Sequence, residues 1–120
     1  MTTTDIAKDF VSMLKKRDDA GAAAKYNADS IASYEAMDGP MAVCKGKAEV
    51  KKKGEWFFAN HEVHSASAEG PFVNGDQFVV RFKYDVTPKA TGKRMQMDEV
   101  GIYTAKDGKI VEERFCYLLP

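Results

Sequence analysis

Two glutamates of this chain stand where an alternating strand should carry apolar side chains. Glu99 falls on the same face of an expected strand as Met97 and Tyr103, and Glu113 alternates in the same way with Phe115. Burial of a carboxyl group among apolar side chains is costly and raises its pKa. Because perturbed carboxyls of this kind gather at functional sites, the two acids indicate a pocket with acidic groups in its wall.

A third acid, Glu35, shares one face of a short expected strand with Ile31 and Ser33. Two carboxyls in different environments can divide the roles of general acid and general base between them. The set therefore favours proton-transfer chemistry. The alternative is that these acids are exposed, or are held in ion pairs by the arginines Arg81, Arg94 and Arg114.

The two histidines lack the spacing of a zinc motif. His61 and His64 stand at i and i+3 across an expected helix-to-strand junction, whereas a helical zinc pair needs i and i+4. No metal site is therefore expected. His64, at the start of a strand, is expected to line the pocket and to shuttle protons.

Two tyrosines, Tyr84 and Tyr117, share the inward faces of their expected strands, so each is expected to offer a hydroxyl group to a ligand. Asp85 has the opposite parity to Tyr84 and is expected on the outer face of the sheet. The sequence has no glycine-rich phosphate loop, no Ser-His-Asp arrangement and no dinucleotide fingerprint. No cofactor is expected for this reason.

The spacing of apolar residues predicts three helices. The first begins at a Thr4 cap, the second covers residues 18–26, and the third covers residues 47–60. The expected buried stripe of the first helix comprises Ile6, Phe10, Met13 and Leu14.

Strands are predicted for residues 30–36, 63–68, 77–87, 94–103 and 109–117, with the clearest alternation in the third of these ranges. This order of elements predicts an α+β fold in which helices pack on one face of a curved sheet. A pocket in such a fold opens at the wide end of the space between the layers.

The 120 residues fit a single domain spanning the whole chain, 1–120. Acidic and basic residues balance at 18 each, so no nucleic-acid partner is expected. The chain has no long apolar run and no basic, apolar leader, so no membrane association and a cytoplasmic location are expected. The run 51–53 of three lysines is interpreted as a solvated helix face, and Cys44 and Cys116 as reduced structural thiols.

Several short motifs are similar to those of a known superfamily. They are residues 26–30 (YNADS), 38–40 (DGP), Gly46, 56–60 (WFFAN), 82–85 (FKYD), 98–100 (DEV) and 107–113 (DGKIVEE). With these motifs the chain resembles the nuclear transport factor 2-like superfamily, and within it the SnoaL-like polyketide cyclase and ketosteroid isomerase group. The resemblance implies a cystatin-like architecture, in which a cone-shaped, curved antiparallel sheet wraps around a long N-terminal helix and two further helices.

The resemblance also implies roles for individual residues. Glu35 falls where the isomerase group keeps its general base, and Glu99 falls near the second inward acid, which donates to the substrate oxyanion; Asp98, one position away, is the alternative. The isomerases carry a tyrosine on the first helix as their main oxyanion donor, and the matching position here is Phe10 or Val11. This departure argues against ketosteroid isomerisation itself. The matching inward positions of the last strand are Glu113, Phe115 and Tyr117.

We therefore expect a cofactor-free isomerase, cyclase or dehydratase that uses Glu35 and Glu99 on a small hydrophobic molecule. The expected ligand-binding residues are His64, Tyr84, Glu113, Phe115 and Tyr117. Two alternatives remain open: a non-catalytic binder of a small hydrophobic ligand, and a dimeric interaction module. The resemblance implies a homodimer through the outer sheet face, where Val79, Val100 and Ile102 would otherwise expose apolar surface.

Overall fold

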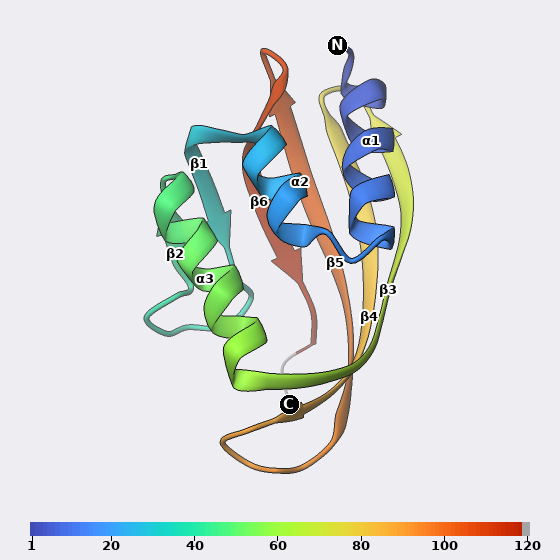
Figure 1. The fold of residues 1–120 in the computed structure, drawn as a ribbon. Helices are drawn as coiled ribbons and strands as arrows, with labels where there is room; N and C mark the ends of the chain where they lie inside the picture. Colours follow the sequence, from blue (N-terminus) through green and yellow to red (C-terminus); the bar gives the residue numbers. More distant parts are fainter. Residues whose placement is uncertain (119–120) are drawn as a thin grey trace.

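Three α-helices and six β-strands make up residues 1–118, the part of the chain that the computed structural model describes (Figure 1). In chain order they are α1 (Thr3–Lys15), α2 (Asp19–Tyr26), β1 (Asn27–Tyr34), β2 (Val43–Lys45), α3 (Lys47–Asn60), β3 (His61–Asn74), β4 (Gln77–Pro88), β5 (Met95–Lys106) and β6 (Lys109–Cys116). The strands form one sheet in the order β2-β1-β6-β5-β4-β3. Neighbouring strands are antiparallel except for β1 and β6, which run parallel.

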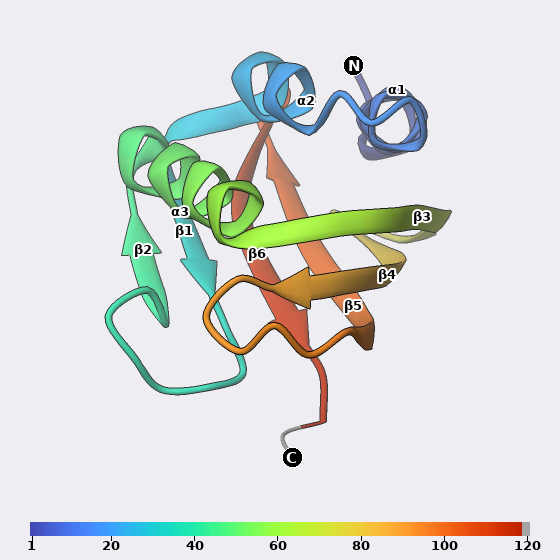
Figure 2. The same ribbon diagram turned by 60° about the horizontal axis from the view of Figure 1, so that its bottom comes forward.

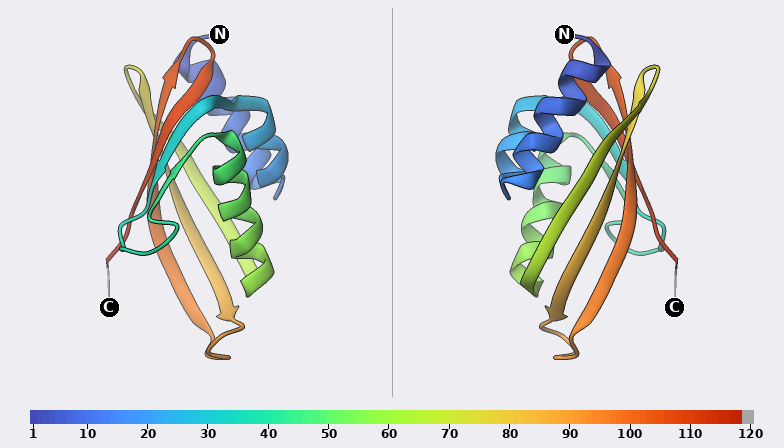
Figure 3. Two further views of the ribbon diagram at one scale, coloured as in Figure 1. Left: turned by 90° about the vertical axis from the view of Figure 1, so that its left-hand side faces the viewer. Right: turned by 90° about the vertical axis from the view of Figure 1, so that its right-hand side faces the viewer.

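The helices lie together on the concave face of the curved sheet, as the side views show (Figure 3). The α+β architecture predicted from the sequence is therefore confirmed. Figure 2 shows the end of the molecule that lies at the bottom of Figure 1. At this end, α3 and the chain that follows β1 lie opposite the β4–β5 connection. None of the helices within residues 1–118 combines the length and the apolar character needed to cross a membrane.

Helix α1 supplies one side of the core. Its buried residues recur at the spacing of one helical face, and they are Ile6, Ala7, Phe10, Val11 and Leu14. The ring of Phe10 lies 5.9 Å from that of Phe78 and 5.1 Å from that of Tyr103, so the helix packs on β4 and β5. The predicted Thr4 cap is wrong, because Thr2 and Asp5 form a reciprocal capping box that starts the helix two residues earlier.

The chain between β1 and α3 is more regular than its sequence predicts. The three residues of β2 pair with β1, and the next residue, Gly46, has a φ of 94° that turns the chain into α3. Helix α3 has the predicted bounds. Strand β3 is longer than expected, because pairing with β4 continues, with a shift of register, past Gly70.

The faces of β5 and β6 place the acids. Strand β6 changes register opposite Thr104 and Ala105, so Ile110 is the fully buried residue there rather than Val111. Beyond this irregularity Tyr103 pairs with Glu113 and Gly101 pairs with Phe115. The inward face therefore carries both Glu99 and Glu113, as the alternation of the two strands predicts.

Candidate functional site

A cavity of about 810 Å³ lies between the helices and the concave face of the sheet. This volume is in the range of sites that enclose a small organic molecule. Aromatic side chains line it from every layer, and they include Phe10, Trp56, Phe57, Phe82, Tyr84, Tyr103 and Phe115. Its polar lining is dominated by acids, which are Asp19, Glu35, Asp38, Glu99 and Glu113.

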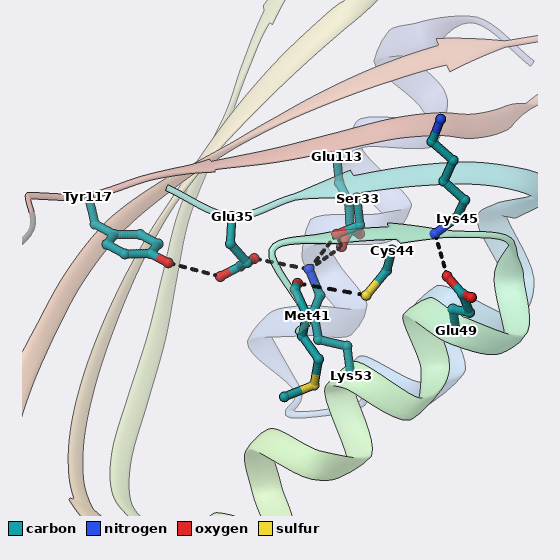
Figure 4. A network of polar contacts seen from close by, with 9 residues as sticks. All are labelled: Ser33, Glu35, Met41, Cys44, Lys45, Glu49, Lys53, Glu113 and Tyr117. Carbon is teal, nitrogen blue, oxygen red and sulfur yellow. Dashed lines mark hydrogen bonds and ion pairs between the residues drawn. The ribbon is translucent and has the colours of Figure 1, made fainter. Parts of the chain in front are cut away.

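Glu35 follows the last residue of β1 and lies in the cavity wall. Its carboxylate accepts hydrogen bonds from the Lys53 ammonium at 3.0 Å and from the Tyr117 hydroxyl at 3.2 Å (Figure 4). Glu35 thus has a fixed orientation, with 24% of its side chain exposed. The alternative of an ion pair with an arginine does not hold for Glu35 within residues 1–118, because its ion-pair partner is a lysine of α3.

Lys53 corrects the interpretation of the three-lysine run. Lys51 and Lys52 are exposed, as predicted, but only 14% of the Lys53 side chain is exposed. Its ammonium donates to Ser33 Oγ and Glu35 Oε2, and it lies 3.9 Å from Glu113 Oε2. The missed signal was helical spacing, because residue 53 lies three after Val50 and four before Phe57, on the face that turns inward.

Glu113 is the most deeply buried acid of the site, with 8% of its surface exposed. It stands directly opposite Ser33 in the β1–β6 pair and accepts a hydrogen bond of 2.7 Å from the Ser33 hydroxyl. Burial raises the pKa of the Glu113 carboxyl, while the Ser33 hydrogen bond and the Lys53 charge act in the opposite direction.

Glu99 faces the cavity, and Asp98 does not. Asp98 lies on the outer face of β5 and makes two hydrogen bonds to Arg81, of 3.0 and 2.7 Å. Burial, followed by the negative charge of Glu35, raises the pKa of Glu99 to about 7. The structure thereby decides between the two adjacent acids in favour of Glu99 as the inward one.

Four of the five expected ligand-contacting residues, Tyr84, Glu113, Phe115 and Tyr117, line the cavity. The fifth, His64, does not: it is exposed, and its Nε2 lies 2.8 Å from Thr87 Oγ1 on β4. The expectation that His64 lines the pocket is wrong, because β3 begins at His61 and changes register between Val63 and Ser65. His61 lines the cavity instead.

Two contacts with Phe57 of α3 hold the His61 ring in place. Its ring stacks on that of Phe57 at 4.3 Å, and its Nδ1 lies 2.8 Å from the Phe57 carbonyl oxygen. Within residues 1–118, no three His, Cys, Asp or Glu side chains come together in an arrangement that would hold a metal ion. Cys44 is buried and Cys116 exposed, and both are free thiols.

Comparison with known proteins assigns the family. The model of the SnoaL-like domain matches residues 1–117. The chain belongs to the SnoaL-like domain family. This SnoaL-like domain shares 67% identity and a TM-score of 0.96 with a candidate SnoaL-like polyketide cyclase from Mesorhizobium loti, over 98% of this chain and 100% of that one.

More distant structures show the same fold. An NTF2-like protein from Burkholderia thailandensis is 19% identical to this SnoaL-like domain, with a TM-score of 0.82 over 97% of this chain and 90% of that one. A protein with a cystatin-like fold from Xanthomonas campestris is 18% identical, with a TM-score of 0.76 over 96% and 89%. No curated protein matches the sequence.

Proposed function

We propose that this SnoaL-like domain is a cofactor-free enzyme that removes a proton next to a carbonyl group of a small, apolar substrate. One observation carries the proposal: two carboxyls, Glu35 and Glu99, line one cavity in different environments. Glu35 accepts two hydrogen bonds from charged and polar donors, whereas the pKa of Glu99 is raised to about 7 by burial and by the charge of Glu35. Two carboxyls in such different environments can take the separate roles of base and acid.

In the proposed reaction Glu35 takes the proton from the carbon next to the carbonyl group. The electron pair of the broken C–H bond moves to the carbonyl oxygen, where Glu99, in its protonated form, donates a hydrogen bond to the developing enolate. The enolate then takes the proton back from Glu35 at another carbon, attacks a second carbonyl carbon whose oxygen takes that proton, or expels a hydroxyl group from the neighbouring carbon, which takes that proton and leaves as water. These three outcomes are isomerisation, cyclisation and dehydration.

The wall of the cavity supports an apolar substrate and distinguishes this site from that of the ketosteroid isomerases. Phe10 lies at the cavity wall, so α1 provides no phenol at this position, whereas Val11 is buried in the core. Glu99 is then the acid best placed to stabilise the enolate. The likeness to a candidate polyketide cyclase at 67% identity favours cyclisation among the three outcomes.

Deuterium exchange tests the proposal without knowledge of the natural substrate. Apolar ketones and β-diketones are incubated with the protein in deuterium oxide, and loss of the proton next to the carbonyl group is followed by NMR. We expect Glu35→Gln and Glu99→Gln each to reduce the exchange rate by at least 100-fold while the affinity for the ketone is retained. Asp98→Asn is the matched control, because Asp98 adjoins Glu99 but faces outward. Wild-type exchange no faster than buffer would contradict the proposal.

The ion pair between Glu35 and Lys53 favours one alternative function, the binding of a hydrophobic ligand without turnover. If the Glu35 carboxylate stays paired with the Lys53 ammonium, which lies 3.0 Å away, it orients a ligand and removes no proton. In the same experiment, saturable binding of the ketones with no exchange above buffer would support this alternative.

A further inference from the structure

Lys53 is the single lysine or arginine among the residues that line the cavity within the described part of the chain. It faces an excess of acidic groups in the same wall, of which Glu35 and Glu113 are its direct neighbours. A cation that is largely withdrawn from water persists only where its charge and its N–H groups are compensated. Its place is therefore set by the groups that surround it.

The hydrogen bonds around Lys53 form a network in which the donor and the acceptor of each bond are determined. The Ser33 hydroxyl donates its only hydrogen to Glu113, which leaves its oxygen free to accept from the Lys53 ammonium. A second N–H of Lys53 points to Glu35, which also accepts from Tyr117 (Figure 4). The ring of Phe115 lies 5.1 Å from the ammonium and closes another side.

Regular secondary structure carries the three residues of this network. Ser33 and Glu113 are cross-strand partners near the C-terminal end of β1, and both are buried. Lys53 lies in the middle of α3, a helix of 14 residues. The ammonium is thus held from the sheet side by Ser33 and Glu113 and from the helix side by its own stem.

We propose that Lys53 is a positioning residue of the site, held by Ser33 and Glu113, which compensates the charge of the Glu35 carboxylate and holds it turned toward the cavity. This inference rests on the proposed role of Glu35 as the base. Removal of the ammonium would leave the acids of the cavity wall without a compensating charge, which favours the protonated forms of Glu99 and Glu113, and would release the Glu35 carboxylate from its orientation. A Glu35 carboxylate that turns away from the cavity cannot take a proton from the substrate.

Two variants of adjacent lysines test the proposal. Lys53→Met removes the ammonium and keeps most of the apolar stem, whereas Lys52→Met makes the same change on an exposed residue of the same helix. Lys53→Arg restores the positive charge. The full chain, labelled with carbon-13 at the glutamate carboxyls, is titrated by NMR, and the exchange of a ketone proton is measured in parallel.

We expect the Lys53→Met protein to shift the carboxyl titration of Glu99 to higher pH, because the Lys53 charge lowers that pKa, and to lower kcat for exchange at least 10-fold with a smaller effect on KM. The basic limb of its pH profile, which Glu99 sets, should move to higher pH. Lys53→Arg should recover part of kcat, and Lys52→Met should match the wild type in every measurement. Ser33→Ala should give a smaller shift in the same direction, and it serves in place of Lys53→Met if that variant does not fold.

The two readouts separate failure of this inference from failure of the proposed function. Unchanged carboxyl titrations in both Lys53→Met and Ser33→Ala would overturn the positioning role, whatever the activity. If the wild type shows no exchange, the proposed reaction falls, and the titrations still decide whether Lys53 compensates the charge of the acids in the cavity wall. A loss of exchange in Lys53→Met with unchanged titrations and an unchanged pH profile would also overturn the inference.

Discussion

Asp98 and Glu99 are adjacent acids of β5 whose carboxyl groups lie on opposite faces of the sheet. Two hydrogen bonds from Arg81 hold the pKa of Asp98 below its ordinary value, whereas burial and the charge of Glu35 raise that of Glu99 to about 7. Two adjacent positions on one strand thus differ in kind. Asp98 forms a solvated ion pair, whereas Glu99 is a carboxyl that changes its charge near neutral pH.

The stability of the protein should depend on the charge of Glu99. Its folded-state pKa of about 7 lies above the ordinary value of 4.5, so the folded state holds the proton more tightly than the unfolded state. Ionisation of Glu99 therefore costs no stability below about pH 4.5, and the cost grows to roughly 3 kcal/mol as pH rises through 7. Urea unfolding should show that Glu99→Gln is more stable than wild type at pH 8.5, with the gain shrinking toward pH 5.

Asp98→Asn provides the opposite case for this measurement. Because the pKa of Asp98 is lowered by Arg81, loss of its charge should remove stability rather than add it at pH 8.5. If Glu99→Gln raises the free energy of unfolding by the same amount at pH 5 and at pH 8.5, ionisation of Glu99 does not destabilise the folded state.

The proposed reaction should slow as pH rises through about 7. Glu99 donates to the enolate only while it is protonated, and its pKa of about 7 sets the upper limit of that form. The rate of ketone proton exchange in the wild type should therefore fall about tenfold per pH unit well above pH 7. The residual exchange of Glu99→Gln should lack this basic limb, and a limb of the same midpoint in that variant would assign it to another group.

Gly101 should tolerate no side chain, because two aromatic rings occupy the space above it. A Cβ at this position would lie 2.9 Å from the Tyr103 ring and 3.2 Å from the Phe115 ring. The Tyr103 ring is itself stacked on Phe78 at 5.0 Å and has little freedom to move. We expect Gly101→Ala to destabilise the protein by about 1–3 kcal/mol in thermal or urea unfolding.

Gly54 offers the matched control for this substitution. It lies inside α3, and a Cβ there would meet no atom within 4 Å. Gly54→Ala should therefore stabilise the protein by up to about 1 kcal/mol through helix propensity. Equal effects of the two substitutions would contradict the packing described around Gly101.

We propose that the outer face of the sheet forms a homodimer. Phe72, Val79 and Ile102 are successive cross-strand partners on β3, β4 and β5, and Phe72 is 62% exposed. Such a row of apolar side chains on one face favours association. Sedimentation at micromolar concentration should show a dimer that Ile102→Lys converts to a monomer. Met37→Lys, at the exposed cavity rim, should leave the dimer intact, and a monomeric wild type would refute the proposal.

The sequence alone predicts most of the fold and part of the site. The bounds of α3, the presence of strands β5 and β6, and the inward parity of Glu99 and Glu113 all follow from local periodicity. Strand β2 was missed because it has only three residues, too few to show a period. His64 was misplaced because an irregularity of β3 changes the parity between Val63 and Ser65.

What only the tertiary structure decided is the partner of each acid. Alternation along a strand determines toward which face a carboxyl points, because successive side chains take opposite faces. It does not determine what lies across the cavity, since that depends on how a helix distant in sequence docks on the sheet. Lys53 belongs to a run of three lysines of which two are exposed, and docking of α3 on β1 turns the third toward Ser33, Glu35 and Glu113.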